Sequence, residues 1–519
     1  MAIANFFDRT LLSAAQALQG FNPQEIRTRL AGLAVELAFD ASATTRAEGR
    51  AALDMAARLL ARLYPTLRLT PLDSAAAAHG TVLAGLARAI NPSIDLPKTG
   101  RSAVTLVFGD TAVRRRNPVI YAGSDGWLAK ASENGPQGIG ETDLPYGAGA
   151  AACLAAANVF RALFADALPN PRLDSDAVLS TFDFSTGATA TQGPATTGLD
   201  LGGAPIVGLG AIGNGVIWAL ARDPGPVGAV HLVDHEAVEL TNLQRYVLST
   251  QADVGRVKVE VARTALLAGA SRLEPLTFLT RWDDYVVGRG HPSFDRVVVG
   301  LDSAADRIAV QAALPRRVLN AWTQAGDLGV SRHDFLGEDA CLACLYMPTQ
   351  AAPNRDEEIA TALALPLEQP ILLDIRERLV NGQPVGEPFV RQAAERLGVA
   401  PEVLLPFAQE PLNQFYAKAV CGGQVLRPTA RPPVEAPLAF QSAMAGVLLA
   451  ADFVVESGGL RQVALPTKTT LDLTRPLGRR LGVRIRKVDA AAPARCLCQD
   501  ADFRAAYERR YGATKPDEA

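Results

Sequence analysis

Three glycines between an apolar run and an apolar helix are placed to hold a phosphate group. Gly208, Gly210 and Gly213 stand in the stretch IVGLGAIGNG, residues 206 to 215, which leads directly into VIWALA. This order predicts a strand, a tight turn and a helix. A helix N-terminus binds anions because its first N–H groups are unpaired and the helix dipole is positive there. The phosphate of a nicotinamide dinucleotide and that of ATP both satisfy this pattern.

Charged residues that follow the glycines separate the two ligands. Asp234 ends the apolar run AVHLVD, where a carboxylate binds the ribose hydroxyls of either ligand. Asn242, Arg245 and Lys258 come next, and Asp302 ends the run RVVVGLD. A reaction that expels pyrophosphate needs cations and a metal-binding carboxylate, because charge moves onto the leaving group. The set therefore favours ATP cleavage over hydride transfer.

Alternating strands and helices must position these residues. From residue 204 onward, strand-like runs that end at Asp234 and Asp302 alternate with the helical patterns DVGRVKVEVARTALLAGA and DRIAVQAALP. This alternation predicts an α/β, Rossmann-like fold with a doubly wound parallel sheet. Ligands of such sheets bind at the carboxyl ends of the strands, which is where both aspartates fall.

Composition divides the chain into four parts. Residues 1–195 alternate apolar helices with short β-like runs and end in a linker rich in Gly, Ser and Thr. Residues 196–348 carry the glycine turn. Residues 349–435 read as amphipathic helices interrupted by prolines, and therefore as an insertion. Residues 436–519 begin with the apolar helix LAFQSAMAGVLLAADFVV, which we expect to return to the main sheet.

Two close cysteine pairs predict a metal site. Cys341 and Cys344 form a C-x-x-C, and Cys496 and Cys498 form a C-x-C about 150 residues later. Four thiolates from two short loops suit the tetrahedral preference of a structural Zn²⁺. Four buried thiols without a metal are the alternative.

Composition excludes several classes of partner. The 51 basic and 54 acidic residues give a net charge of -3, too balanced to hold nucleic acid or an anionic membrane. The N-terminal stretch has neither a basic segment nor a long apolar core of the kind found in signal peptides. We therefore expect a cytoplasmic protein that binds neither nucleic acid nor membrane.

The ordered motifs resemble the adenylation domain shared by ThiF, MoeB and the ubiquitin-activating enzymes. GLGAIG, VDHEAVELTNLQR, DVGRVKVE, GLDSAADR and CLACL follow that family's order over residues 200–345, and the likeness resumes at FQSAMAGVLLAADF and RCLCQD. The resemblance implies an enzyme that binds Mg²⁺ and ATP. It also implies a ubiquitin-like protein partner with a C-terminal glycine, whose terminal carboxylate is adenylated.

The resemblance assigns nucleotide contacts to five residues: Asp234 to the ribose, Asn242, Arg245 and Lys258 to the phosphates, and Asp302 to Mg²⁺. One departure is visible, because the family often has glutamine where this chain has Tyr246. The alternative for Arg245 and Lys258 is a pair of solvated surface cations.

The first part of the chain resembles the inactive half of a pseudo-dimer. Residues 1–195 are accordingly expected to form an inactive adenylation-like half. In the family, a partner subunit or an inactive half lends an arginine to the site, and Arg9 in FFDRTLLSAAQALQG has the matching position. The resemblance implies that Arg9 reaches the γ-phosphate; an exposed charge on a terminal helix is the alternative. A homodimer is a further arrangement that the family uses.

Cys421 is the candidate nucleophile for a thioester. Its place in the helical insertion resembles the catalytic-cysteine domain of ubiquitin-activating enzymes, whereas Cys153 lies in AAACLAAA and is typical of a core residue. FYAKAVCGG predicts a helix C-terminus, whose dipole disfavours a thiolate. Lys418 and Arg427 would offset that effect by lowering the thiol pKa.

These features predict activation of a ubiquitin-like protein by adenylation, thioester formation on Cys421 and transfer to a conjugating enzyme. The organisation resembles bacterial relatives of ubiquitin-activating enzymes, some of which act in antiviral defence. Two alternatives remain: an adenylyltransferase for a sulfur-carrier protein of thiamin or molybdopterin synthesis, and a NAD-binding oxidoreductase.

Overall fold

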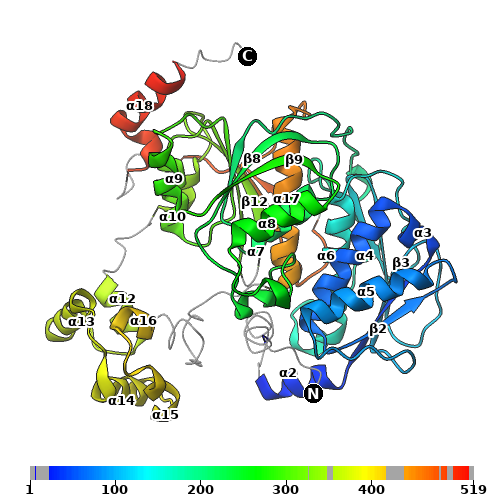
Figure 1. Ribbon diagram of the computed structural model, residues 1–519, viewed down its shortest axis with the longest axis horizontal. Helices are drawn as coiled ribbons and strands as arrows, with labels where there is room; N and C mark the ends of the chain where they lie inside the picture. Colours follow the sequence, from blue (N-terminus) through cyan, green and yellow to red (C-terminus); the bar gives the residue numbers. More distant parts are fainter. Residues whose placement is uncertain are drawn as a thin grey trace. The chain divides into compact units, whose positions relative to one another are not determined.

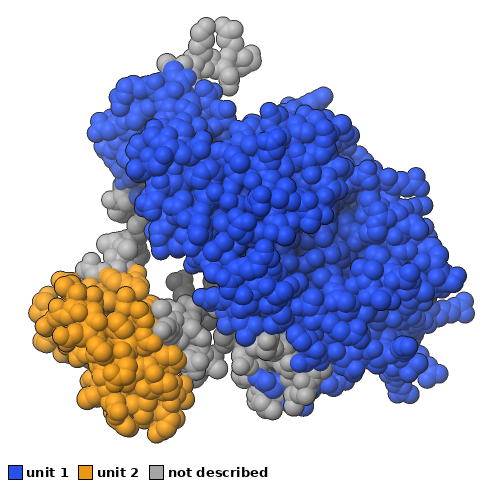
Figure 2. Space-filling model, in the orientation of Figure 1, with its two compact units in different colours: residues 1–347, 437–519 blue, residues 348–436 orange. Residues whose placement is uncertain are grey.

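The computed structural model contains two compact units. It describes residues 6, 23–324, 327–347, 355–416, 438–478, 481–487 and 495–512. Residues 1–347 and 437–519 form the first unit, and residues 348–436 form the second (Figure 2). The segments that the sequence analysis separates near residue 195 lie together in the first unit, because buried side chains from both join one continuous core.

A six-stranded mixed sheet forms the N-terminal part of the first unit (Figure 1). Its strands are β1 (Ala34–Phe39), β2 (Thr66–Pro71), β3 (Val104–Phe108), β4 (Val119–Asp125), β5 (Leu128–Ser132) and β6 (Ala177–Ser180). They lie in the order β2-β1-β3-β4-β5-β6. The pairs among β1 to β4 are parallel, whereas β5 and β6 add antiparallel strands.

Helices of the N-terminal part bury small side chains. They are α2 (Pro23–Ala31), α3 (Ala41–Thr45), α4 (Ala47–Leu63), α5 (Ala77–Ile90) and α6 (Tyr146–Leu163). The alanine-rich α6 is almost wholly buried and packs against α4. Cys153 lies on this helix with no exposed surface, as expected for a core residue, and burial raises the pKa of its thiol.

An eight-stranded sheet forms the second part of the first unit. Its strands are β7 (Ala204–Val207), β8 (Val227–Val233), β9 (Arg272–Phe278), β10 (Arg296–Val299), β11 (Arg317–Thr323), β12 (Leu328–Asp334), β13 (Lys468–Leu471) and β14 (Gly482–Val483). Their order is β14-β13-β12-β11-β10-β7-β8-β9, and the strands from β11 to β9 pair in parallel. The strand order reverses at β7, so the prediction of a doubly wound α/β sheet is confirmed.

The helices of this second part include one from the far end of the chain. They are α7 (Ala211–Leu220), α8 (Lys258–Ala268), α9 (Trp282–Gly288), α10 (Ala304–Ala312), α11 (Leu342–Tyr346), α17 (Ala439–Ser457) and α18 (Ala501–Tyr511). α17 packs against α7, α6 and β11, as the sequence analysis expects of a returning helix. It is long and apolar enough to cross a membrane, but 94% of it is buried, so core packing accounts for its composition.

The described part of the second unit is helical. Its helices are α12 (Arg355–Ala362), α13 (Gln369–Asn381), α14 (Gly386–Leu397), α15 (Pro401–Leu404) and α16 (Leu412–Phe415). They enclose a small apolar core of their own, which includes Ile359, Ile375, Val390 and Leu412. The unit is therefore held together by hydrophobic contacts within its own helices.

Close packing of α7 against α17 depends on two glycines. A Cβ at Gly446 would lie 2.3 Å from the carbonyl oxygen of Ile212 and 2.6 Å from the Cα of Gly215. We expect Gly446→Ala to lower the free energy of unfolding by about 1–3 kcal/mol, because neither helix backbone can yield. Gly85→Ala is the control, since Gly85 lies in α5 with no atom within 4 Å of the added Cβ. Equal melting temperatures for the two variants would contradict this account of the packing.

Candidate functional site

The glycine turn has the predicted strand, turn and helix. Gly208 follows β7 with a φ of 85°, a conformation that favours glycine. A Cβ at Gly213 would lie 2.3 Å from the carbonyl oxygen of Gly208. α7 begins directly after Gly210, so its N-terminal N–H groups lie at the carboxyl end of the sheet. This arrangement can bind an anion.

Asp234 links the end of β8 to the glycine turn. One carboxylate oxygen accepts a hydrogen bond from the backbone N–H of Leu209 at 2.8 Å, and the other accepts one from the backbone N–H of Glu236 at 2.9 Å. Because β10, β7 and β8 are parallel neighbours, the same edge also carries Asp302, which is exposed just beyond β10. The sheet therefore brings the two predicted aspartates and the glycine turn together.

The segment of residues 240–250, here called the 240–250 loop, carries two of the predicted phosphate ligands. The side-chain oxygen of Asn242 accepts from the Glu239 N–H at 3.0 Å and caps a short 3-10 turn. Arg245 donates to the Gln244 side chain at 3.2 Å and is only partly exposed. The roles of Asn242 and Arg245 on phosphates stay predictions.

Lys258 is a buried cation at the start of α8. Its side chain is 5% exposed and its ammonium contacts the Glu236 carboxylate, so it is not a solvated surface lysine. Burial alone would lower its pKa, but Tyr246, Asp234 and Glu236 hold the Lys258 pKa above its usual range. The ammonium therefore stays charged beside the glycine turn.

Tyr246 occupies the space between the glycine turn and the cations. It is 4% exposed, and its hydroxyl lies 3.4 Å from where a Cβ at Gly210 would stand. The centroid of its ring is 5.3 Å from the Lys258 ammonium and 5.8 Å from the Arg245 guanidinium. The sequence flags this tyrosine only as a departure from a family pattern; the structure places it among the candidate site residues.

Asn214 is a site residue that sequence reasoning missed. Its amide nitrogen donates to the carbonyls of Leu209 and Gly210 at 2.9 and 3.0 Å, and its oxygen accepts from the Leu248 N–H at 3.1 Å. The side chain therefore joins the glycine turn to the 240–250 loop. A lone asparagine in the apolar stretch AIGNGVIWAL was the available signal, because a buried amide needs partners.

Arg307 holds the backbone next to Asp302. Its guanidinium donates to the Asp302 carbonyl at 3.3 Å, contacts the Leu301 carbonyl, and donates to the Asn320 side chain at 3.2 Å. The residue is 6% exposed on α10. It therefore fixes the end of β10, from which the Asp302 side chain projects to solvent.

The N-terminal sheet has no counterpart of the glycine turn at its equivalent strand end. β1 is followed by Asp40, whose carboxylate accepts from the backbone N–H groups of Ser42 at 3.0 Å, Asp110 at 2.7 Å and Thr111 at 2.9 Å. A side-chain carboxylate thus already satisfies the N–H groups that could have bound an anion. Among the described residues, this end of β1 therefore lacks free N–H groups of the kind that the glycine turn presents.

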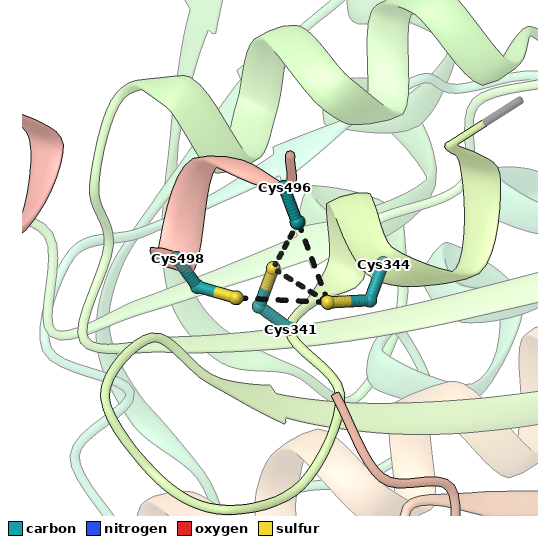
Figure 3. Close-up of side chains that lie close together, drawn as sticks. All are labelled: Cys341, Cys344, Cys496 and Cys498. Carbon is teal, nitrogen blue, oxygen red and sulfur yellow. Dashed lines mark hydrogen bonds between the residues drawn. The ribbon is translucent and has the colours of Figure 1, made fainter. Parts of the chain in front are cut away.

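The four cysteines predicted as metal ligands come together (Figure 3). The sulfur of Cys341 lies 3.7 Å from that of Cys344 and 3.5 Å from that of Cys496, and Cys344 lies 3.6 Å from Cys498. All four residues are buried. Sulfurs about 2.3 Å from a tetrahedral zinc would be about 3.8 Å apart, so this donor set fits a metal ion.

Two further site residues that the sequence analysis predicts, Arg9 and Cys421, lie outside the described residues.

Two family models match the chain in sequence. A model described as the ThiF family matches residues 203–471, and a model described as Prokaryotic E2 family C matches residues 38–165. The second description differs from the adenylation-like half that the sequence analysis expects for residues 1–195, and that expectation stays a prediction.

Individual proteins differ widely in how much of this chain they cover. The "Uncharacterized protein y4jF" of Sinorhizobium fredii (strain NBRC 101917 / NGR234) is 45% identical over 518 residues, 99% of this chain and 98% of that protein. Adenylyltransferase and sulfurtransferase MOCS3 of Aedes aegypti is 32% identical over 143 residues, 27% of this chain and 32% of that protein. A crystal structure of E. coli MccB with MccA-N7isoASN has a TM-score of 0.34 at 18% identity, and the match covers 58% of this chain and 68% of that one.

The ThiF model begins just before β7 and ends with β13, so it covers more than half of the chain. It contains the glycine turn, the 240–250 loop, Lys258 and Asp302, together with the first cysteine pair and the helical second unit. This chain belongs to the ThiF family.

Proposed function

We propose that this chain is a ThiF-type adenylyltransferase that uses ATP to activate the C-terminal carboxylate of a small protein. The observation that carries the proposal is the meeting of the glycine turn, Asp234, Lys258 and Asp302 at one edge of the sheet. Membership of the ThiF family supports it, and so does the name of the MOCS3 relative.

The site's own residues suit adenylation. The N–H groups at the start of α7 would hold phosphate oxygens, and Asp234 would face the ribose. The substrate carboxylate attacks the α-phosphorus; a carboxyl oxygen–phosphorus bond forms, the bond to the β-phosphate oxygen breaks, and pyrophosphate leaves. The charged Lys258 favours that step because negative charge grows on the leaving group. Asp302 would hold Mg²⁺, which when bound neutralises part of the same charge.

A buried, charged lysine separates this proposal from the nicotinamide alternative. Hydride transfer leaves the dinucleotide pyrophosphate intact and does not require a cation held at such a desolvation cost. In this chain the Lys258 side chain is 5% exposed, and the Lys258 ammonium and the Arg245 guanidinium lie 5.3 and 5.8 Å from the centroid of the Tyr246 ring. These cations favour a reaction in which phosphate charge increases.

We further propose that the partner is a ubiquitin-like protein with a C-terminal glycine. The Cys421 thiolate would attack its acyl adenylate, so that a carbon–sulfur bond forms, the carbon–oxygen bond to the phosphate breaks and AMP leaves. The thioester would then be transferred to a conjugating enzyme. The five cysteines in the described part of the chain are all buried, so none of them is an accessible acceptor. That leaves Cys421 within this chain. The match of residues 38–165 to a family named for E2 proteins also supports conjugation.

Activation of a sulfur-carrier protein is the second candidate. The observation that favours it is the name of the MOCS3 relative, which couples adenylyltransferase and sulfurtransferase activities in that protein. This route would yield a thiocarboxylate and no lasting thioester on Cys421. The two routes therefore share the nucleotide site and differ only in the acceptor.

Nucleotide binding and pyrophosphate exchange test the adenylation site. We expect the full chain to bind Mg-ATP in preference to NAD by calorimetry, and to exchange pyrophosphate with a small glycine-ended partner protein. Lys258→Ala should lower the exchange rate by about a hundredfold, since it removes a cation from the transition state. Arg263→Ala is the matched control, because Arg263 lies on the same helix and is 47% exposed. Preferential binding of NAD would contradict the proposal.

A covalent adduct tests Cys421. We expect a band containing the chain and its partner on a non-reducing gel, lost on addition of a thiol and absent from Cys421→Ala. Cys153→Ala, which alters a buried core thiol, should keep the band. If Cys421→Ala keeps the thiol-sensitive band, the thioester assignment is wrong, and detection of a partner thiocarboxylate instead would favour the sulfur-carrier route.

We propose that the cysteine cluster holds Zn²⁺, which when bound cross-links the chain end to the adenylation core. Elemental analysis should then find one zinc per chain. Cys341→Ser and Cys498→Ser should each lose the metal and lower the melting temperature, because the ion joins loops far apart in sequence. Cys153→Ala should retain the metal. Protein purified without chelator that carries no metal and melts like Cys498→Ser would overturn this assignment.

A further inference from the structure

A buried arginine from the N-terminal part donates hydrogen bonds to the backbone of the 240–250 loop. Arg62 on α4 is 1% exposed. One of its terminal nitrogens donates to the carbonyls of Tyr246 and Ser249, both at 2.6 Å, and the other donates to the Arg58 carbonyl of its own helix at 2.7 Å. The contact joins residues 184 and 187 positions apart in the chain, within the first compact unit.

A second arginine of α4 binds the two carbonyls that lie between those of Tyr246 and Ser249. Arg58 donates to the carbonyl of Val247 at 2.8 Å and to that of Leu248 at 3.2 Å. Two guanidinium groups from a single helix therefore bind four consecutive carbonyls of the loop. Since carbonyl oxygens in a buried loop need donors, these bonds fix the path of its backbone.

The glycine turn also holds the 240–250 loop, through Asn214. The N–H of Leu248 donates to Asn214, whose amide binds the carbonyls of Leu209 and Gly210. Tyr246, whose carbonyl Arg62 holds, lies with its side chain beside Gly210 and Lys258. A shift of the loop would therefore move groups that face the candidate nucleotide site.

A partly buried carboxylate, Asp54, binds Arg58 and links α4 to α7. One oxygen of Asp54 accepts from Arg58 at 2.8 Å, from the Trp218 indole at 2.7 Å and from Arg222 at 2.7 Å. Burial alone would raise the Asp54 pKa, but Arg58 and Arg222 lower it to about 2. The helix that begins at the glycine turn is thereby linked to the helix that supplies both arginines.

We propose that Arg62 and Arg58 are positioning residues for adenylation, which set Tyr246 and Arg245 for binding of the ATP phosphates. This inference rests on the proposed function. In the described part of the chain no carboxylate pairs with Arg62, and its Nε has no hydrogen-bond partner. A buried charge held in this way is costly as a packing device alone. Fixing the loop accounts for it, and gives the N-terminal part a direct effect on the nucleotide site.

Binding of Mg-ATP to the full chain tests the positioning role. We expect Arg62→Met to raise the Kd for Mg-ATP about tenfold or more, because two carbonyls lose a charged donor and the loop moves. Arg58→Met should raise it by a smaller factor. Arg50→Met is the matched control, because Arg50 lies on the same helix but donates to the carbonyls of Thr44 and Thr45, within the N-terminal part. The Kd of this variant for Mg-ATP should equal that of the wild type.

Hydrogen exchange separates positioning from general loss of stability. The amides of the 240–250 loop should exchange faster in Arg62→Met, while those of β7 and β8 keep their wild-type protection. Wild-type Kd and wild-type loop exchange in folded Arg62→Met would overturn the inference and leave the proposed function standing. A wild-type chain that binds no Mg-ATP would overturn the proposed function first. Should Arg62→Met not fold, Arg58→Met decides by the same two measurements, since the Arg58 side chain is 14% exposed and is replaced more easily.

Discussion

The parallel pairing of β10, β7 and β8 is the constraint on which the candidate site depends. Val207 of β7 lies opposite Val233 of β8 and Val299 of β10, so all three strands reach the carboxyl edge in the same register. Their next residues are therefore neighbours in space, and the Asp234 carboxylate can bind the Leu209 N–H across the gap. A slip of one residue would turn each side chain to the other face of the sheet and remove this contact.

The N-terminal sheet has Asp40 where the second sheet has the glycine turn, and a helix packed on it contacts the candidate site. At the end of β1, the Asp40 carboxylate accepts hydrogen bonds from the N–H groups of Ser42, Asp110 and Thr111, where the end of β7 has the glycine turn. Its helix α4 instead turns Arg58 and Arg62 toward the 240–250 loop. The match to the family described as Prokaryotic E2 family C and the predicted inactive adenylation-like half both concern the part of the chain that forms the six-stranded sheet.

Local patterns predicted the parts of the site that local structure determines. The strand, glycine turn and helix around Gly208, the two aspartates at strand ends and the pairing of C-x-x-C with C-x-C follow from spacing, and the structure brings each group together. The contributions of Asn214 and Arg62 could not be predicted in this way. Asn214 binds two carbonyls close to it in sequence, but its bond to the Leu248 N–H depends on tertiary structure. Nothing in the sequence near Arg62 indicates a carbonyl 184 residues away. The boundary that the sequence analysis places near residue 195 falls between β6 and β7, which belong to different sheets, and buried side chains of both sheets join one core.

Buried cations give the candidate site its electrostatic character. Lys258, Arg62 and Arg307 are each less than a tenth exposed, and each binds groups at or next to the carboxyl edge of the sheet. Burial, together with the nearby Arg58 charge, lowers the pKa of Arg62 to about 9. Burial also lowers the pKa of Arg307, against the opposing effects of Tyr346, Asp302 and Asp306. Charges removed from water in this way act over a low-dielectric path, so they attract a polyanion more strongly than solvated cations would. Glu236 pairs with Lys258 from the solvent side, where its side chain is 57% exposed. Under the proposed function, a phosphate at the glycine turn would compete with Glu236 for the Lys258 ammonium. The exposed Glu236 carboxylate would then return to water at little cost, because surface ion pairs contribute little stability.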